Sequence, residues 1–310
     1  MNKNSLQKSK KIVKYIYKRE VIMEYTLKYD NIQIGINSRG AEQEHLIYNG
    51  KDYMRERDSF WNRKAPVLFP IVGKLRDLKT YIDGKLYSMN QHGFARDLEF
   101  TLEKKGENYL TFLSTYSDET LKMYPFKYEL RITYTIIDKK VSVKYEVTNK
   151  GKDKMYFNIG GHPGFRLPMY ANEKFEDYSV VFDCVENFDA PTVNLENGTL
   201  NFDNTIPYRD IKKIQLDYKY FEIDAIVIPN IKSKKVLLVN KNKKGIAFSF
   251  NNMNTLAIWT KPNAPFVCLE PWKGYADHSD SDYNFIKKDD IVSLKYNETY
   301  TCGYEIEILD

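Results

Sequence analysis

Two consecutive segments, Leu130-Arg-Ile-Thr-Tyr-Thr-Ile136 and Val141-Ser-Val-Lys-Tyr-Glu-Val147, alternate apolar and polar residues throughout. A period of two is typical of a β-strand with one buried face. Only a short connection around Asp138-Lys-Lys140 separates them, so we predict an antiparallel hairpin with a three-residue turn. The same alternation recurs at 246–250 and 300–308. These segments predict a chain built mainly from antiparallel strands.

Helical signals are few. The segment Ser117–Tyr124 has an N-cap candidate in Ser117 and ends before Pro125, so we expect a helix of at most two turns there. Turn signals recur along the chain at Asp83-Gly84, Asn149-Lys-Gly151 and Asn197-Gly198, with no linker, internal repeat or low-complexity tract between them. We therefore predict an all-β fold in which residues 23–310 form a single large antiparallel two-sheet β-sandwich.

Residues 1–22 differ in composition from the rest of the chain. Seven basic residues against Glu20 give this segment a charge of +6. One interpretation is a short basic amphipathic helix, built on Ile12, Tyr15 and Ile16, that touches a membrane or a partner. We favour the other interpretation, a disordered or non-native extension, because Met23 is itself a suitable start.

The composition excludes several classes of function. The whole chain carries +5, so the part after residue 22 carries −1, which does not suit a nucleic-acid binder. Cys184, Cys268 and Cys302 are far apart and form no C-x-x-C pair, which argues against a zinc site or a disulfide framework. Together with the absence of any run of 18 apolar residues, this predicts a cytoplasmic protein with no membrane partner.

Two histidines stand in glycine-rich surroundings. His162 lies in Asn158-Ile-Gly-Gly-His-Pro-Gly-Phe165, where glycines allow close approach and proline favours an extended preceding residue. His92 lies in Gln91-His-Gly-Phe-Ala-Arg96. A single histidine is more often structural, but two in such loops favour proton transfer to a small substrate. The two histidines are 70 residues apart without a ligand spacing, so we expect no metal and no cofactor.

A third motif, Cys268-Leu-Glu-Pro-Trp-Lys-Gly274, contains a carboxylate beside two apolar rings. In a partly apolar pocket Glu270 would have a raised pKa and would suit a general base. The alternative is a surface glutamate at a strand end. The indole of Trp272 would either lie along the apolar face of a sugar or pack in the core. The sequence alone leaves both pairs of alternatives open.

Basic residues lie near these motifs. Arg96 would either bind sugar hydroxyls or a phosphate through two bonds, or form a salt bridge with Asp97. Lys74 and Arg76 follow Phe69-Pro-Ile-Val-Gly73. There is no G-x-G-x-x-G after a strand, no P-loop and no G-x-S-x-G elbow.

Four motifs in order resemble those of the aldose 1-epimerase (galactose mutarotase) family, in its branch of LacX-like and hexose-6-phosphate-epimerase-like proteins. They are the segments 65–73, 91–96 and 160–165 and the Leu269-Glu-Pro-Trp motif. The resemblance covers about residues 24–310. It implies the family's two-sheet supersandwich and the interconversion of the α and β anomers of an aldose without metal or organic cofactor.

The resemblance also implies roles for individual residues. Glu270 would take the proton of the C1 hydroxyl, His162 would protonate the ring oxygen, and His92 would hydrogen-bond the substrate nearby. Asp224, in Phe221-Glu-Ile-Asp-Ala225, matches the family aspartate that binds sugar hydroxyls. Further substrate contacts are expected from Gln91, Arg96 and Trp272.

The chain departs from the family pattern at Lys74, where an arginine commonly follows the Val-Gly pair. In a strand, residues i and i+2 share a face, so Arg76 is an alternative to Lys74 for this substrate contact. Lysine cannot reproduce a bidentate contact, and the sequence leaves open which of the two residues replaces the arginine. Three functions stay open: an epimerase for free aldohexoses, one for hexose 6-phosphates, and a non-catalytic sugar-binding protein on the same fold. The expected partner is a sugar or sugar phosphate, and the expected assembly is a monomer or homodimer.

Overall fold

The computed structural model describes residues 14–17 and 20–310. In chain order the strands are β1 (Lys14–Tyr17), β2 (Glu20–Tyr29), β3 (Ile32–Asn37), β4 (Glu42–Tyr48), β5 (Lys51–Asp52), β6 (Val67–Leu68), β7 (Lys79–Ile82), β8 (Lys85–Ser88), β9 (Thr101–Lys105), β10 (Tyr109–Thr115), β11 (Tyr128–Ile137), β12 (Lys140–Asn149), β13 (Met155–Phe157), β14 (Ile159–Gly161), β15 (Gly164–Arg166), β16 (Tyr178–Val193), β17 (Leu200–Gln215), β18 (Ile226–Ile228), β19 (Lys235–Asn240), β20 (Gly245–Asn251), β21 (Thr255–Trp259), β22 (Phe266–Lys273), β23 (Val292–Leu294) and β24 (Thr299–Leu309). The helices are α1 (Asp118–Met123) and the single-turn 3₁₀ segments η1 (Arg76–Leu78), η2 (Ala95–Asp97), η3 (Phe175–Asp177), η4 (Tyr218–Phe221) and η5 (Phe285–Lys287).

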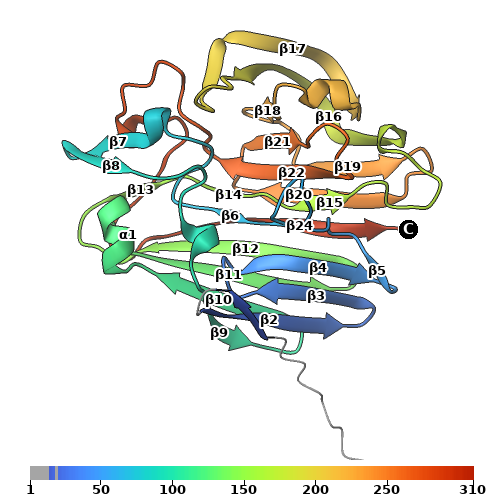
Figure 1. Cartoon of the computed structure of the whole chain (residues 1–310), viewed down its shortest axis with the longest axis horizontal. Helices are drawn as coiled ribbons and strands as arrows, with labels where there is room; N and C mark the ends of the chain where they lie inside the picture. Colours follow the sequence, from blue (N-terminus) through green and yellow to red (C-terminus); the bar gives the residue numbers. More distant parts are fainter. Residues whose placement is uncertain (1–13, 18–19) are drawn as a thin grey trace, which may run out of the picture.

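The described strands build a two-layer antiparallel sandwich (Figure 1). One layer is a nine-stranded sheet in the order β17-β16-β19-β20-β24-β12-β11-β10-β9. The facing layer consists of a five-stranded sheet, β1 to β5, and a six-stranded sheet built on β18-β21-β22-β14-β6 with β15 beside β22. The predicted all-β, antiparallel two-sheet sandwich is therefore confirmed.

Aromatic side chains join the two layers. Tyr25 of β2 packs edge-on against Phe112 of β10, with ring centroids 5.3 Å apart. Phe165 of β15 packs against Phe248 of β20 at 6.0 Å. Buried aromatic pairs of this kind stabilise a core beyond the area that they bury. They also show why the alternating sequence pattern needs two sheets, since each apolar face is covered by the other layer.

The hairpin predicted from the alternating segments is β11–β12. Its inward residues, from Leu130 to Ile136, are at most 2% exposed. The turn is one residue shorter than predicted, because Ile137 pairs with Lys140 and only two residues lie between them. Asp138 has a φ of 53°, in the left-handed region that two-residue hairpin turns require.

Other local predictions are also confirmed. Helix α1 spans Asp118–Met123, and the Ser117 side chain accepts a hydrogen bond from the Thr120 amide, so Ser117 is its N-cap. Asp83-Gly84 is the turn between β7 and β8.

No helix within the described residues is long and apolar enough to cross a membrane.

The predicted basic extension lies mostly outside the described residues, which omit 1–13 and 18–19. Of the described part, residues 14–17 form the strand β1, paired antiparallel with the start of β2 from Lys14↔Met23 to Tyr17↔Glu20. The backbone there is extended rather than helical.

Candidate active site

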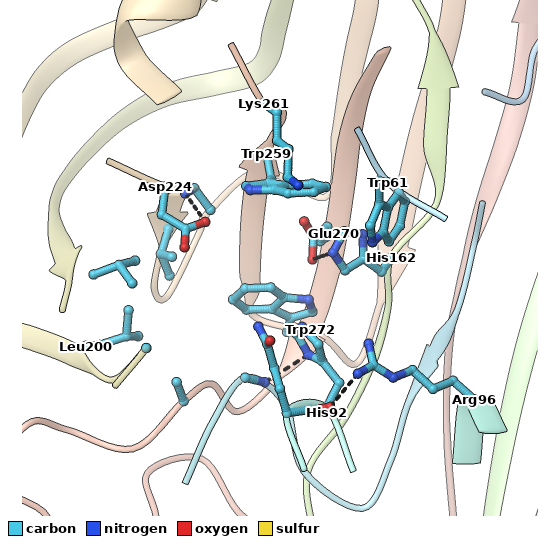
Figure 2. A pocket seen from close by; sticks show the side chains of 17 residues that line it. Trp61, His92, Arg96, His162, Leu200, Asp224, Trp259, Lys261, Glu270 and Trp272 are labelled. Atoms are coloured by element: carbon cyan, nitrogen blue, oxygen red, sulfur yellow. Dashed lines mark hydrogen bonds and ion pairs between the residues drawn. The ribbon is translucent and has the colours of Figure 1, made fainter. Parts of the chain in front are cut away.

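A cavity of about 330 Å³ opens at one side of the six-stranded sheet. All three tryptophans of the chain line it, together with both motif histidines and two carboxylates (Figure 2). The lining residues are Trp61, Gly73, Gln91, His92, Arg96, His162, Val193, Gly198, Leu200, Asp224, Ala225, Val227, Trp259, Lys261, Glu270, Trp272 and Ala276. Polar groups converging in an aromatic pocket are typical of a small-molecule site.

Strand pairing puts the carboxylate of Glu270 between two indoles. In β22, Glu270 and Trp272 share a face because they are two residues apart. Trp259 of β21 lies opposite Cys268, and the small Ala257 lies opposite Glu270. Four residues of strand at about 3.3 Å each separate the rows of the two tryptophans by about 13 Å. In Figure 2 the two indoles bound the space in front of Glu270 from above and below.

His162 and Glu270 form the central polar contact. His162 Nε2 lies 3.1 Å from Glu270 Oε2, and both side chains are almost fully buried. His162 directly follows β14, which pairs with β22 through Gly160↔Trp272. A Cβ at Gly160 would lie 2.6 Å from Trp272 Cδ1, so this glycine allows the strand to pass close beneath the indole. The first motif is thus a strand end that aims the imidazole at the carboxylate.

Burial moves the pKa values of this pair toward their neutral forms. The pKa of Glu270 is raised well above its ordinary value, first by burial and then by the charge of Asp224. Burial lowers the pKa of His162 to about 3, with a further contribution from Arg96. A carboxyl with a raised pKa beside a histidine with a lowered pKa is suited to exchanging a proton with a substrate near neutral pH.

His92 lies beside this pair, with its ring centroid 5.7 Å from that of His162. Its backbone has a φ of 66°, and its Nδ1 accepts a hydrogen bond of 3.1 Å from the Gly73 amide. The neutral ring therefore carries its proton on Nε2. Burial, and after it the charge of His162, lowers the pKa of His92, so the ring is a neutral donor.

Asp224 lies across the cavity from Glu270 (Figure 2). Its Oδ1 accepts a hydrogen bond of 2.8 Å from the Ala225 amide, and burial raises its pKa. The structure thus brings together five expected site residues from distant segments: Glu270, His162, His92, Asp224 and Trp272.

Of the basic residues expected at the site, Arg96 lines the cavity and Lys74 does not. Arg96 lines the cavity, donates from Nη2 to the Gln91 carbonyl at 2.8 Å, and lies 4.0 Å from Asp97. Gln91 lines the cavity as well. Lys74 does not; it borders an adjoining hollow that it shares with Asn90, Gln91 and Arg96.

Of the two alternatives for the family arginine, the one that used Arg76 is wrong. Arg76 Nη1 donates to the Ser281 carbonyl at 2.9 Å, and the guanidinium lies over the Tyr283 ring, away from the cavity. The expectation assumed a strand, but Gly73 has a φ of 69° and η1 begins at Arg76, so residues 74 and 76 do not share a face.

Sequence reasoning missed Trp61, Trp259 and Lys261. The rarity of tryptophan was a usable signal, because all three in the chain line this one cavity. Trp61 stacks on His162 with ring centroids 4.5 Å apart and planes tilted by 30°. No motif surrounds Lys261, which is exposed at the rim.

His162, Cys268 and Glu270 offer ligand atoms within 4.8 Å of one another, a cluster that the sequence spacing had not indicated. A metal would require the Cys268 thiolate. Burial, and after it the charge of Glu270, raises the pKa of that thiol, while His162 and Glu270 already contact each other. The three groups are therefore better suited to holding protons than to holding a cation.

Comparisons with known proteins identify the family of the chain. The family model for aldose 1-epimerase matches residues 23–307. Two LacX proteins of Lactococcus lactis, plasmid and chromosomal, are 34% and 35% identical over 304 and 299 residues, which is 93% of this chain and all of each relative.

Solved structures are similar as well. A galactose mutarotase related enzyme from Lactobacillus acidophilus has a TM-score of 0.87 at 30% identity and covers 93% of this chain and 98% of its own. A galactose mutarotase-like protein from Lactobacillus casei has a TM-score of 0.82 at 28% identity, covering 92% and 99%. By its motifs, its fold and these similarities, the chain belongs to the aldose 1-epimerase family.

Proposed function

We propose that the protein is an aldose 1-epimerase that interconverts the α and β anomers of a free aldohexose by acid–base ring opening. The observation that carries the proposal is the contact of 3.1 Å between His162 Nε2 and Glu270 Oε2 on the wall of a cavity lined by tryptophans. The C1 hydroxyl and the ring oxygen of an aldopyranose are bonded to the same carbon. A base and an acid in contact with each other can therefore reach both oxygens at once.

In this mechanism Glu270 takes the proton of the C1 hydroxyl while an imidazole N–H protonates the ring oxygen, and the C1–ring oxygen bond breaks. The open-chain aldehyde rotates about the C1–C2 bond, and the reverse transfers close the ring on either face of C1. The donor at the ring oxygen is His162, and His92 Nε2–H lies beside it. No proton is gained or lost over the cycle, so the site needs no outside reactant.

The walls support a pyranose as the substrate. Trp259 and Trp272 bound the space on two sides, and indoles pack well on the C–H face of a sugar. Asp224, across from Glu270, would accept hydrogen bonds from the hydroxyls at the far edge of the ring.

The cations around the cavity favour a free sugar over a sugar phosphate. Arg96 and Lys261 lie on opposite sides of the cavity in Figure 2, and Arg76 turns away to Ser281. Lys74 shares the adjoining hollow with Arg96, but the carboxylates of Asp77, Asp97 and Glu196 line that hollow too and disfavour a phosphate there. Phosphate is normally held by converging donors. We also propose a cytoplasmic location, which is supported by the three free thiols Cys184, Cys268 and Cys302.

The test is polarimetry of freshly dissolved α-D-glucose and α-D-galactose with the wild-type protein and Glu270→Gln. The amide keeps the shape of the side chain but cannot accept the proton, so we expect the rate to fall by about 10²–10⁴-fold, the usual contribution of a positioned acid or base. Sugar affinity, measured by calorimetry, should change only a few fold. Sugar binding without catalysis by the wild type would instead support the non-catalytic alternative.

A further inference from the structure

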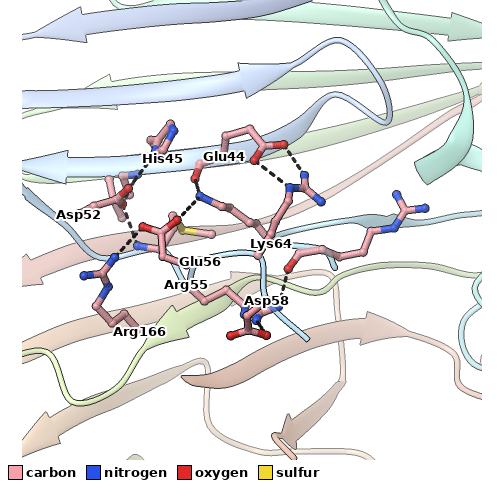
Figure 3. Close-up of polar contacts among 12 residues, drawn as sticks. Glu44, His45, Asp52, Arg55, Glu56, Asp58, Lys64 and Arg166 are labelled. Atoms are coloured by element: carbon pink, nitrogen blue, oxygen red, sulfur yellow. Dashed lines mark hydrogen bonds and ion pairs between the residues drawn. The ribbon is translucent and has the colours of Figure 1, made fainter. Parts of the chain in front are cut away.

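The loop from Glu56 to Lys64, called the Trp61 loop below, forms the wall of the cavity beside His162. Just before it lies Arg55, whose side chain is only 1% exposed (Figure 3). Its Nη1 donates to the carbonyls of Trp61 and Arg63, the latter at 2.8 Å, and its Nη2 donates to Asp58 Oδ1 at 2.6 Å. One buried guanidinium therefore ties three points of this loop together.

Asp58 completes the arrangement. The same oxygen, Oδ1, accepts hydrogen bonds from the amides of Phe60 at 2.9 Å and Trp61 at 3.1 Å. The backbone amide and carbonyl of Trp61 are thus both held by the Arg55–Asp58 pair. Charge-assisted bonds from a planar guanidinium fix position more firmly than neutral ones.

The held residue, Trp61, covers the imidazole. Its indole lies 4.5 Å from the His162 ring, 5.3 Å from that of Trp259 and 6.0 Å from that of Phe266. Arg55 stacks on the same Phe266, at 4.0 Å from the ring centroid. As a result the His162 side chain is only 8% exposed although it lines an open cavity.

Arg55 also explains the last glycine of the His162 motif. A Cβ on Gly164 would lie 2.8 Å from Arg55 Cδ, 3.1 Å from Arg55 Cγ and 3.2 Å from Cys268 Sγ. The Gly164 carbonyl accepts a hydrogen bond from the Arg55 amide, and the Gly164 amide donates to the Lys64 carbonyl. The motif strand therefore contacts the residue just before the Trp61 loop and the last residue of the loop.

We propose that Arg55 is a positioning residue for the acid–base pair: through Asp58 and the backbone of Trp61, it holds the indole against His162, which orients the imidazole toward Glu270 and excludes water from it. This inference rests on the proposed function. Arg55 itself touches neither the cavity nor the expected substrate position, since it is absent from the cavity lining. All side-chain hydrogen bonds of Arg55 go to the Trp61 loop, so we expect its side chain to act on the pair mainly through Trp61, and this expectation is testable.

The first experiment is a double-mutant cycle on kcat. Displacing a catalytic group by about 1 Å can cost about 10²-fold, so we expect Arg55→Met and Trp61→Ala each to lower kcat by about 10- to 100-fold. If Arg55 acts through Trp61, adding Arg55→Met to Trp61→Ala costs less than about threefold more. Multiplication of the two separate effects would overturn the proposal.

Two variants act as controls in the cycle. Arg131→Met removes an arginine of β11 that pairs with Glu103 of β9 and Glu129 of β11, away from the cavity, and should leave kcat unchanged. Arg55→Lys keeps a buried cation but loses the fork, so it should fold and still lower kcat. Full activity in Arg55→Lys would contradict positioning by the guanidinium.

The second experiment does not depend on turnover. In a Trp259→Phe/Trp272→Phe background, Trp61 is the sole tryptophan. Adding Arg55→Met or Arg55→Lys should shift its emission to longer wavelength and raise its quenching by acrylamide, whereas Arg131→Met should not. Unchanged emission would overturn the positioning role. If the wild type lacks anomerase activity but the emission shifts, the proposed function fails while the Arg55–Trp61 coupling stands.

Discussion

At the scale of single residues, burial sets the chemistry of Glu270. Its pKa is raised well above the ordinary value by burial first and by Asp224 second. A base with a raised pKa is protonated below that pKa, so kcat/KM should fall as the pH drops through a value well above 4.5. The measurement is kcat/KM for α-D-glucose as a function of pH. His162, His92 and Arg96 face the same cavity and are unchanged in this measurement.

Asp224→Asn provides the internal check on this profile. Removing the Asp224 charge lowers the pKa of Glu270, so the acidic limb should move to lower pH even though sugar binding weakens. An acidic limb near the ordinary glutamate value, about 4.3, in both proteins would show that Glu270 is not the titrating base.

Arg96 tests the choice between a brace and a phosphate site. It donates to the Gln91 carbonyl, next to His92, and this bond braces the turn that carries the histidine. We therefore expect Arg96→Met to lower turnover of glucose and glucose 6-phosphate by similar factors. Arg76→Met, which removes an arginine outside the cavity, should change neither. A wild-type preference for glucose 6-phosphate that Arg96→Met abolishes would show phosphate recognition instead.

At the scale of elements, β14 positions the site through its glycines. A Cβ at Gly160 would lie 2.6 Å from Trp272 Cδ1 and 3.2 Å from the Pro271 carbonyl. Gly160→Ala should push the Trp272 indole into the cavity where the sugar is expected to bind, which raises KM. It should also lower the free energy of unfolding by about 1–3 kcal/mol through overpacking. Urea denaturation and polarimetry measure the two effects.

Gly151→Ala is the matched control for this substitution. At Gly151 no atom lies closer than 3.4 Å to the added Cβ, so stability should change by less than about 0.5 kcal/mol. Wild-type KM and stability in Gly160→Ala would show that β22 can shift, and that the close passage of β14 does not position Trp272.

At the scale of the whole molecule, the sandwich should form without residues 1–22. The ladder between β2 and β3 begins at Glu24↔Asn37, and the Met23 amide donates to Ser38 Oγ at 3.0 Å, so a chain starting at Met23 keeps these contacts. We expect its melting temperature and turnover to match those of the full chain. A drop of several degrees, equivalent to about 1 kcal/mol or more in a domain of this size, would show that the segment packs on the body.

The sequence by itself determined the strands, because the alternation of apolar and polar residues is a local property that each segment carries. The alternation that includes Leu130/Ile132 and Val141/Val143 predicted β11 and β12, and Ser117 predicted the start of α1. The acid–base candidates could be found too, since His92, His162 and Glu270 stand in motifs that resemble a known family.

Only the tertiary structure decided which residues meet. Strand register across β21 and β22 places Trp259 on the same face as Glu270. The buried Arg55 bonds to the backbone of Trp61, whose indole lies against His162. The departure from strand geometry after Gly73 turns Arg76 away, which periodicity could not indicate. Spacing along the chain carries no information about such contacts, because pairing and burial between distant segments create both the cavity and the shifted pKa values within it.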